Sequence, residues 1–77
     1  MTTYCVEASV RHGDWFEVVD FDADLDSLAD ASSIAENAIR ENPIISRTRV
    51  VAARSDDEDE FPTVCEFVRS FGKIIKI

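Results

Sequence analysis

The sequence predicts an α+β fold, in which one antiparallel sheet is packed on one face by a single helix. Residues 26–42 carry apolar side chains at helical spacing between clear start and stop signals. Four other stretches carry alternating or β-branched apolar residues, and a short fifth stretch, KIIKI, lies at the end of the sequence. The predicted order is therefore β-β-α-β-β with an optional fifth strand. A length of 77 residues predicts one domain, residues 1–77.

The first two predicted strands form a hairpin. Residues 2–11 carry apolar side chains at every second position, as a half-buried strand does. His12 and Gly13 follow as a two-residue loop, in which glycine accommodates the positive φ angle of a tight turn. Residues 15–21 carry apolar side chains on both faces. Either this second strand is central in the sheet, or a bulge near residues 18–19 changes its face.

The predicted helix has well-marked ends. Asp26 or Ser27 can cap the first backbone amides, and Ser27 with Asp30 approximates a capping box. Pro43 prevents the helix from continuing past Asn42. The apolar face is rich in alanine, which lets a helix lie close to a sheet. This face comprises Leu28, Ala31, Ala35 and Ala38, widened by Ile34 and Ile39.

The remaining strands follow the helix. Residues 44–54 are rich in β-branched side chains and form the third predicted strand. Residues 63–71 form the fourth, and Gly72 allows a turn into a final strand whose lysines suit a sheet edge. Between the third and fourth strands, five consecutive carboxylates predict a solvated loop. We expect the core to contain Val6, Val18, Leu28, Ile34, Ile39 and Val50.

The two cysteines are expected to be buried and reduced. Cys5 and Cys65 both lie in apolar strands, and neither belongs to a CxxC pair. A disulfide between them is the alternative.

The net charge of −8 is unevenly distributed along the chain. Residues 14–41 contain nine carboxylates and one basic residue, and residues 56–60 add five carboxylates. The other segments contain only two carboxylates, Glu7 and Glu66, against seven basic residues. Because the acidic segments would repel phosphates, nucleic acid is a poor partner and a basic protein surface is the expected one.

Aspartate occupies every second position in DFDADLD, from Asp20 to Asp26. An EF-hand loop that begins at Asp20 or Asp22 lacks the required glycine at its sixth position and the glutamate at its twelfth. Looser magnesium binding is one alternative, and attraction of acids to the positive end of the helix dipole is another. On an extended strand, alternate residues repeat every ~6.6 Å, near the spacing of backbone phosphates. This pattern therefore suggests imitation of a short stretch of nucleic-acid backbone.

The sequence contains no recognisable catalytic motif. Its one histidine, His12, falls in a predicted turn, and no GxSxG, P-loop or zinc spacing occurs. Exposed, mutually repelling carboxylates stay ionised, which does not suit a general acid. We therefore expect a protein that is not an enzyme and uses no cofactor or metal, with a small metal-dependent enzyme as an alternative.

The expected partner-binding surface combines the acidic runs with an aromatic side chain that can stack on arginine. A core position is the alternative for the aromatic residue. The members of this surface are Asp14, Trp15, Glu17, Asp20, Asp22, Asp24, Asp26, Asp56, Asp57, Glu58, Asp59 and Glu60.

In size, acidity and strand order the chain resembles small phage-encoded inhibitors of bacterial defence, of the anti-CRISPR and anti-restriction type. The resemblance covers the whole chain but rests on architecture and charge, so no residue roles are transferred. It implies a protein that mimics nucleic acid and occludes a basic nucleic-acid-binding surface of its partner. The alternative is a structural or assembly subunit that acts through a homo-oligomeric sheet interface, with a homodimer as a secondary expectation.

A cytoplasmic location is expected, in the bacterial host cell if the chain is phage-encoded. No run approaches the ~20 apolar residues of a membrane span, and the first residues lack the basic and apolar pattern of a signal segment.

Overall fold

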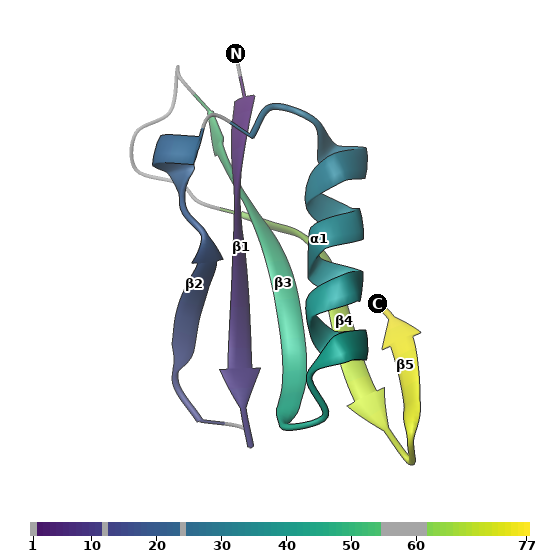
Figure 1. The fold of residues 1–77 in the computed structure, drawn as a ribbon. Helices are drawn as coiled ribbons and strands as arrows, with labels where there is room; N and C mark the ends of the chain where they lie inside the picture. Colours follow the sequence, from purple (N-terminus) through teal and green to yellow (C-terminus); the bar gives the residue numbers. More distant parts are fainter. Residues whose placement is uncertain (1, 12, 24, 55–61) are drawn as a thin grey trace.

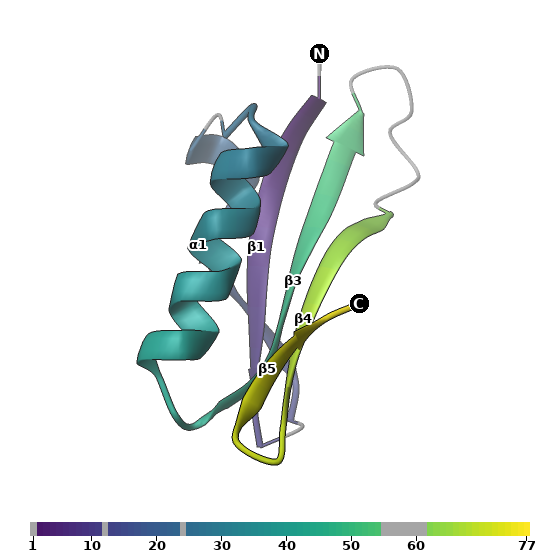
Figure 2. The same ribbon diagram turned by 90° about the vertical axis from the view of Figure 1, so that its right-hand side faces the viewer.

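The computed structural model describes residues 2–11, 13–23, 25–54 and 62–77. These residues form a five-stranded antiparallel sheet with one α-helix packed on one face, so the predicted α+β class is confirmed (Figures 1 and 2). The optional fifth strand is present. The elements are β1 (Thr2–Val10), β2 (Trp15–Val19), the 3-10 helix η1 (Phe21–Ala23), α1 (Leu28–Glu41), β3 (Ile45–Arg54), β4 (Thr63–Ser70) and β5 (Lys73–Lys76).

The strand order is β2-β1-β3-β4-β5, which places β2 and β5 at the two edges. Both β2 and β3 run antiparallel to β1, so they run parallel to each other on either side of it. Parallel strands need a crossover connection, and α1 supplies it by passing over one face of the sheet (Figure 1). The pairing of β1 with β3 extends from Thr2 opposite Arg54 to Val10 opposite Ile45.

Helix α1 begins and ends close to the predicted signals. The Ser27 hydroxyl accepts a hydrogen bond from the Asp30 backbone N–H at 3.2 Å, which confirms the predicted cap. Asn42 is the C-cap rather than part of the helix. Three residues spaced four apart, Ala31, Ala35 and Ile39, are fully buried against the sheet.

Small side chains bring the helix backbone close to β3. The Thr48 hydroxyl, which is buried, donates to the Ala35 carbonyl at 3.1 Å. This hydrogen bond satisfies a buried polar side chain at the centre of the helix–sheet interface.

The prediction of which residues form the core is partly correct. Val6, Ile39 and Val50 are fully buried, and Ile34 packs against them with part of its surface exposed. Leu28 and Val18 were wrongly assigned, since 43% and 40% of their surfaces are exposed.

Both errors have a structural reason. Leu25 packs against the core near the start of α1, where its carbonyl accepts from the Tyr4 N–H at 2.8 Å, and Leu28 remains at the rim. On β2, the pairing with β1 shifts between Val6 opposite Val19 and Glu7 opposite Glu17, which leaves Val18 without a partner. The bulge alternative for this strand is therefore confirmed, and the central position is wrong because β2 lies at an edge.

The two tight connections differ from each other. In the described part of the β1–β2 connection, Arg11 has a positive φ angle of 52° and Gly13 does not. The prediction that Gly13 supplies the positive φ angle is therefore wrong. His12 lies outside the described residues. The Gly13 N–H donates to the Val10 carbonyl at 2.8 Å. Between β4 and β5, Phe71 and Gly72 both have positive φ angles, as a two-residue hairpin turn of type I′ requires.

Cys5 and Cys65 are free and buried, as predicted. Cys5 lies opposite Val51, and both line the sheet face away from the helix, whereas Cys65 belongs to the core under α1. The two thiols are therefore on opposite faces of the sheet.

Candidate partner-binding site

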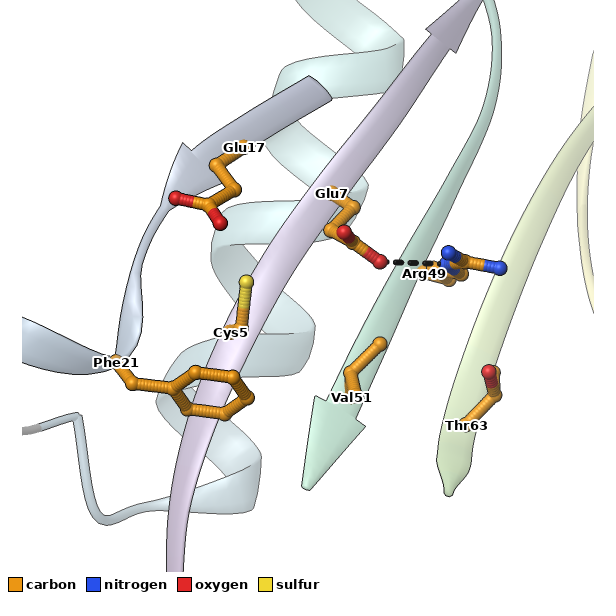
Figure 3. Close-up of a pocket in the computed structure, with 7 residues that line it drawn as sticks. All are labelled: Cys5, Glu7, Glu17, Phe21, Arg49, Val51 and Thr63. Atoms are coloured by element: carbon orange, nitrogen blue, oxygen red, sulfur yellow. Dashed lines mark hydrogen bonds and ion pairs between the residues drawn. The ribbon is translucent and has the colours of Figure 1, made fainter. Parts of the chain in front are cut away.

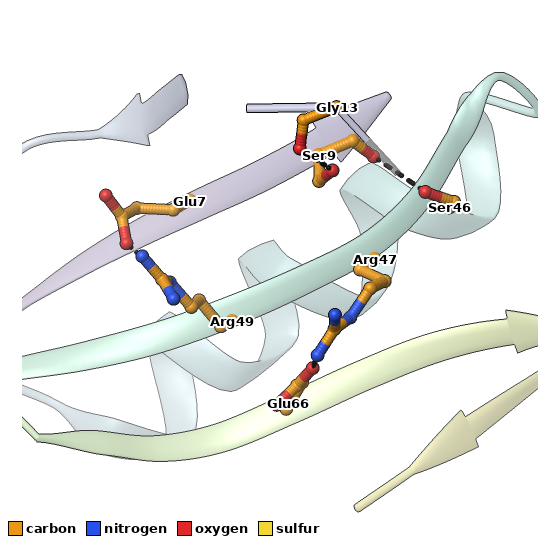
Figure 4. Close-up of polar contacts among 7 residues, drawn as sticks. All are labelled: Glu7, Ser9, Gly13, Ser46, Arg47, Arg49 and Glu66. Carbon is orange, nitrogen blue, oxygen red and sulfur yellow. Dashed lines mark hydrogen bonds and ion pairs between the residues drawn. The ribbon is translucent and has the colours of Figure 1, made fainter. Parts of the chain in front are cut away.

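The sheet face opposite α1 carries a band of charged side chains from the three central strands. The Arg49 Nε of β3 donates to the Glu7 carboxylate of β1 at 2.7 Å. Arg47, two residues earlier on β3, donates to the Glu66 carboxylate of β4 (Figure 4). Because side chains alternate along a strand, the two arginines share one face, and each reaches a different neighbouring strand. The centre of this open face is thus charge-balanced.

Trp15 of β2 is packed against these arginines. The Arg49 guanidinium carbon lies 4.0 Å from the centre of the indole ring, and that of Arg47 lies 5.4 Å from it. Both distances suit a cation–π interaction. Trp15 is half-buried, so part of its ring is covered by arginines of this chain rather than left for a partner.

Beside this band lies an open hollow of about 270 Å³ (Figure 3). Apolar atoms of Cys5 and Val51 form part of its wall, and the phenyl ring of Phe21 stands beside Cys5 (Figure 3). Two carboxylates and one guanidinium also reach it. Its lining residues, which come from β1, β2, η1, β3 and β4, are Cys5, Glu7, Glu17, Phe21, Arg49, Val51 and Thr63.

The Cys5 thiol in this hollow is not a nucleophile at neutral pH. Burial raises its pKa from 9.0 to about 11, and the carboxylates of Glu7, Glu17 and Asp20 add to the rise, whereas Arg49 opposes it. The thiolate is the reactive form, and at neutral pH it is a negligible fraction. The same carboxylates give the hollow a negative potential.

The raised pKa of Cys5 predicts a specific loss of stability at high pH. The neutral thiol is favoured in the folded state, so its contribution is fully present below pH 9 and is lost as the pH rises through the window from 9.0 to about 11. Urea unfolding of the native chain and of Cys5→Ala across this window checks the effect. We expect the native chain to lose more stability than the variant, and parallel curves would contradict the prediction.

The structure describes the side chains of only some of the acidic residues that were predicted to bind a partner. Asp14 precedes β2, Glu17 lies within it, and Asp20 and Asp26 lie on the segment that leads to α1, all with exposed side chains. The side chain of Asp22 lies outside the described part, as do Asp24, Asp56, Asp57, Glu58, Asp59 and Glu60.

The predicted regular spacing of the aspartates is wrong. Residues Phe21–Ala23 form the 3-10 helix η1, where each residue advances by about 2.0 Å rather than the ~3.3 Å of a strand. Asp20 therefore does not begin an extended ladder, because the backbone that follows it is not extended.

Sequence reasoning missed most of the residues that form the open face. Cys5, Phe21 and Val51 were assigned to strands without a role, because their convergence depends on the register of β1 against β3 and on η1. One signal was available. Glu7 and Glu66, the only carboxylates in otherwise basic segments, are the two residues that pair with Arg49 and Arg47.

The opposite edge of the sheet has a different character. On β5 the charged residues are Lys73 and Lys76, which suit an edge as predicted, and Ile75 and Ile77 beside them are exposed. The described part of the sheet is therefore acidic along β2 and basic along β5.

Among the residues that the structure describes, no three His, Cys, Asp or Glu side chains are grouped so that they could hold a metal ion. In the same residues, no helix has both the length and the apolar composition needed to cross a membrane. Comparison of the chain with known proteins found no matching family model, no matching curated protein and no matching solved structure.

Proposed function

We propose that the protein is a non-enzymatic, acidic binding protein that occludes a basic, nucleic-acid-binding surface of a partner protein. The observation that carries this proposal is the acidic edge, which comprises Asp14, Glu17, Asp20 and Asp26. Their side chains are exposed along β2 and the segment that follows it. Within the described residues, Asp14, Glu17 and Asp26 take part in no ion pair.

Pairing elsewhere in the molecule supports the same proposal. Glu7 and Glu66 are held by arginines, so they neutralise charge within the sheet and add little to the field outside it. Asp14, Glu17 and Asp26 have no such counter-charge among the ion pairs of the described residues. Because the chain as a whole has a net charge of −8, the acidic edge attracts a positive groove and repels phosphates. Charge, rather than a regular imitation of phosphate spacing, is the basis of the proposed competition.

Assembly of copies of this chain through β5 is less well supported. Exposed Ile75 and Ile77 offer apolar surface for such a contact. In an antiparallel pair in which the two β5 strands overlap fully, however, Lys73 of one copy would lie opposite Lys76 of the other, and like charges directly opposite are destabilising.

A charge-reversal experiment tests the proposed function. The immobilised chain captures its partner from a lysate of the cells that make it, and the purified partner is then offered labelled DNA or RNA with and without the chain. We expect the chain to displace the nucleic acid, and to do so less well at about 200 mM than at about 50 mM salt. Reversing Asp14 and Glu17 to lysine should slow association at least tenfold, on the order expected for lost electrostatic steering.

The matched control reverses Glu36 and Glu41, which lie on α1 on the other side of the sheet. It changes the net charge by the same amount. A partner that binds nucleic acid and the chain together would contradict the proposal, as would equal slowing by both double variants.

A further inference from the structure

The hollow on the open face has the size of a site for one side chain. Its volume of about 270 Å³ falls below the roughly 300–1,000 Å³ of sites for drug-sized ligands. Cys5 and Val51 are 2% and 7% exposed, so these walls are fixed by the packing of β1 and β3. Phe21 adds an aromatic ring from η1 (Figure 3). The hollow therefore combines rigid apolar walls with an opening to solvent.

The polar lining of the hollow has an excess of negative charge. Arg49 is held by Glu7 at 2.7 Å, which leaves Glu17 as the second carboxylate. Glu17 is exposed and takes part in none of the ion pairs among the described residues. An anion in the hollow would face two carboxylates, whereas a cation would pair with Glu17.

The same sheet face already shows how a guanidinium is held there. Arg49 packs on the Trp15 ring at 4.0 Å and donates to the Glu7 carboxylate, so an aromatic ring and a carboxylate together fix one arginine. Another ring and another carboxylate, those of Phe21 and Glu17, line the hollow. A planar guanidinium can stack on the ring and form two hydrogen bonds with the carboxylate, which a lysine ammonium cannot do.

We infer that this hollow is the site at which an arginine side chain from the basic surface of the partner inserts, with Glu17 as its counter-ion and Phe21 beside its guanidinium. This inference rests on the proposed function, because it names the group that the partner contributes. It adds one defined contact to what is otherwise attraction between surfaces of opposite charge.

Titration of the isolated full-length chain with a small probe tests the inference without the partner. N-acetyl-arginine amide is added to ¹⁵N-labelled protein at constant ionic strength, and amide chemical shifts are followed. We expect saturable shifts at Cys5, Glu17 and Val51, weaker binding of N-acetyl-lysine amide, and no saturable shift with N-acetyl-citrulline amide, which has the same shape without the charge. Glu17→Gln should weaken binding of the arginine probe at least tenfold, on the order expected for loss of a charged hydrogen-bond partner.

Glu41→Gln is the matched control, because it makes the same change at an exposed position on α1 that does not line the hollow. The control variant should bind the arginine probe with an affinity within about twofold of the native value, since an exposed charge far from the hollow acts on the probe only through a screened field. Equal weakening by Glu41→Gln and Glu17→Gln, equal binding of the arginine and citrulline probes, or equal binding of the arginine and lysine probes would each overturn the inference.

The two proposals fail in different measurements. If the probe does not bind but the chain still displaces nucleic acid from its partner, the arginine site is wrong and the occlusion stands. If the probe binds as expected but the partner carries nucleic acid and the chain together, the site stands and the occlusion is wrong.

Discussion

Replacing Ile39 with alanine should lower the free energy of unfolding by about 2–5 kcal/mol. Ile39 is fully buried at the helix–sheet interface, so the change removes apolar contacts and leaves a cavity between α1 and the sheet. A domain of this size has a total stability of roughly 5–10 kcal/mol. The melting temperature should fall by about 8 °C or more, at about 4–8 °C for each kcal/mol.

Leu28→Ala is the matched control on the same helix. Leu28 was expected in the core and is 43% exposed, so its truncation should cost less than about 1 kcal/mol. Thermal unfolding followed by circular dichroism compares the two variants. Equal losses, or a larger loss for Leu28→Ala, would show that the buried face of α1 is assigned wrongly.

Replacing Arg69 with methionine should cost about 2–3 kcal/mol. Its guanidinium extends from β4 to the end of α1, where it donates to the carbonyls of Ile39 and Asn42, and it also donates to the carbonyl of Ile45 at the start of β3. The last carbonyls of a helix lack partners within the helix, and a cation there also interacts favourably with the helix dipole. Methionine keeps most of the side-chain volume but leaves these acceptors without this donor.

Arg40→Met provides the comparison for Arg69. Arg40 also lies in the last turn of α1, but it is exposed and its ion pair with Glu36, at 2.6 Å, joins residues four apart on the helix. Such pairs contribute about 0.3–0.5 kcal/mol. Chemical denaturation of both variants should therefore separate them by more than 1 kcal/mol, and similar losses would mean that Arg69 does not cap the helix.

The elements of the fold could be predicted because each has a local signal. Alternating apolar residues placed β1, the β-branched run placed β3, and the pair Ser27 and Pro43 bounded α1. These signals depend on a few neighbouring residues and do not need the rest of the fold.

The register between strands could not be predicted in the same way. The pairing of Glu7 with Arg49 joins residues that are far apart in sequence, and it follows from the register of β1 against β3. The positive φ angle at Arg11 is likewise imposed by the hairpin as a whole, since arginine does not favour this conformation. The bulge at Val18 was predicted only as one of two alternatives for β2.

The candidate site depended most on long-range structure. The exposed positions of Asp14 and Glu17 agree with the charge pattern, whereas the hollow required Cys5, Phe21 and Val51 to converge from β1, η1 and β3. Charge can be read from composition, but a concave surface exists only after the strands have been placed side by side.

The position of β1 between β2 and β3 has a consequence for the order of folding. The hairpin of β1 and β2 involves nearby residues, but the other edge of β1 pairs with a strand that extends to Arg54. Pairing β1 with β3 closes the chain between them into a loop, and the entropic cost of this closure must be met before the core contacts form. Folding is therefore slower than in a protein whose contacts are mostly between residues close in sequence. During synthesis the nascent hairpin would therefore keep one edge of β1 unpaired until the whole of β3 has emerged from the ribosome.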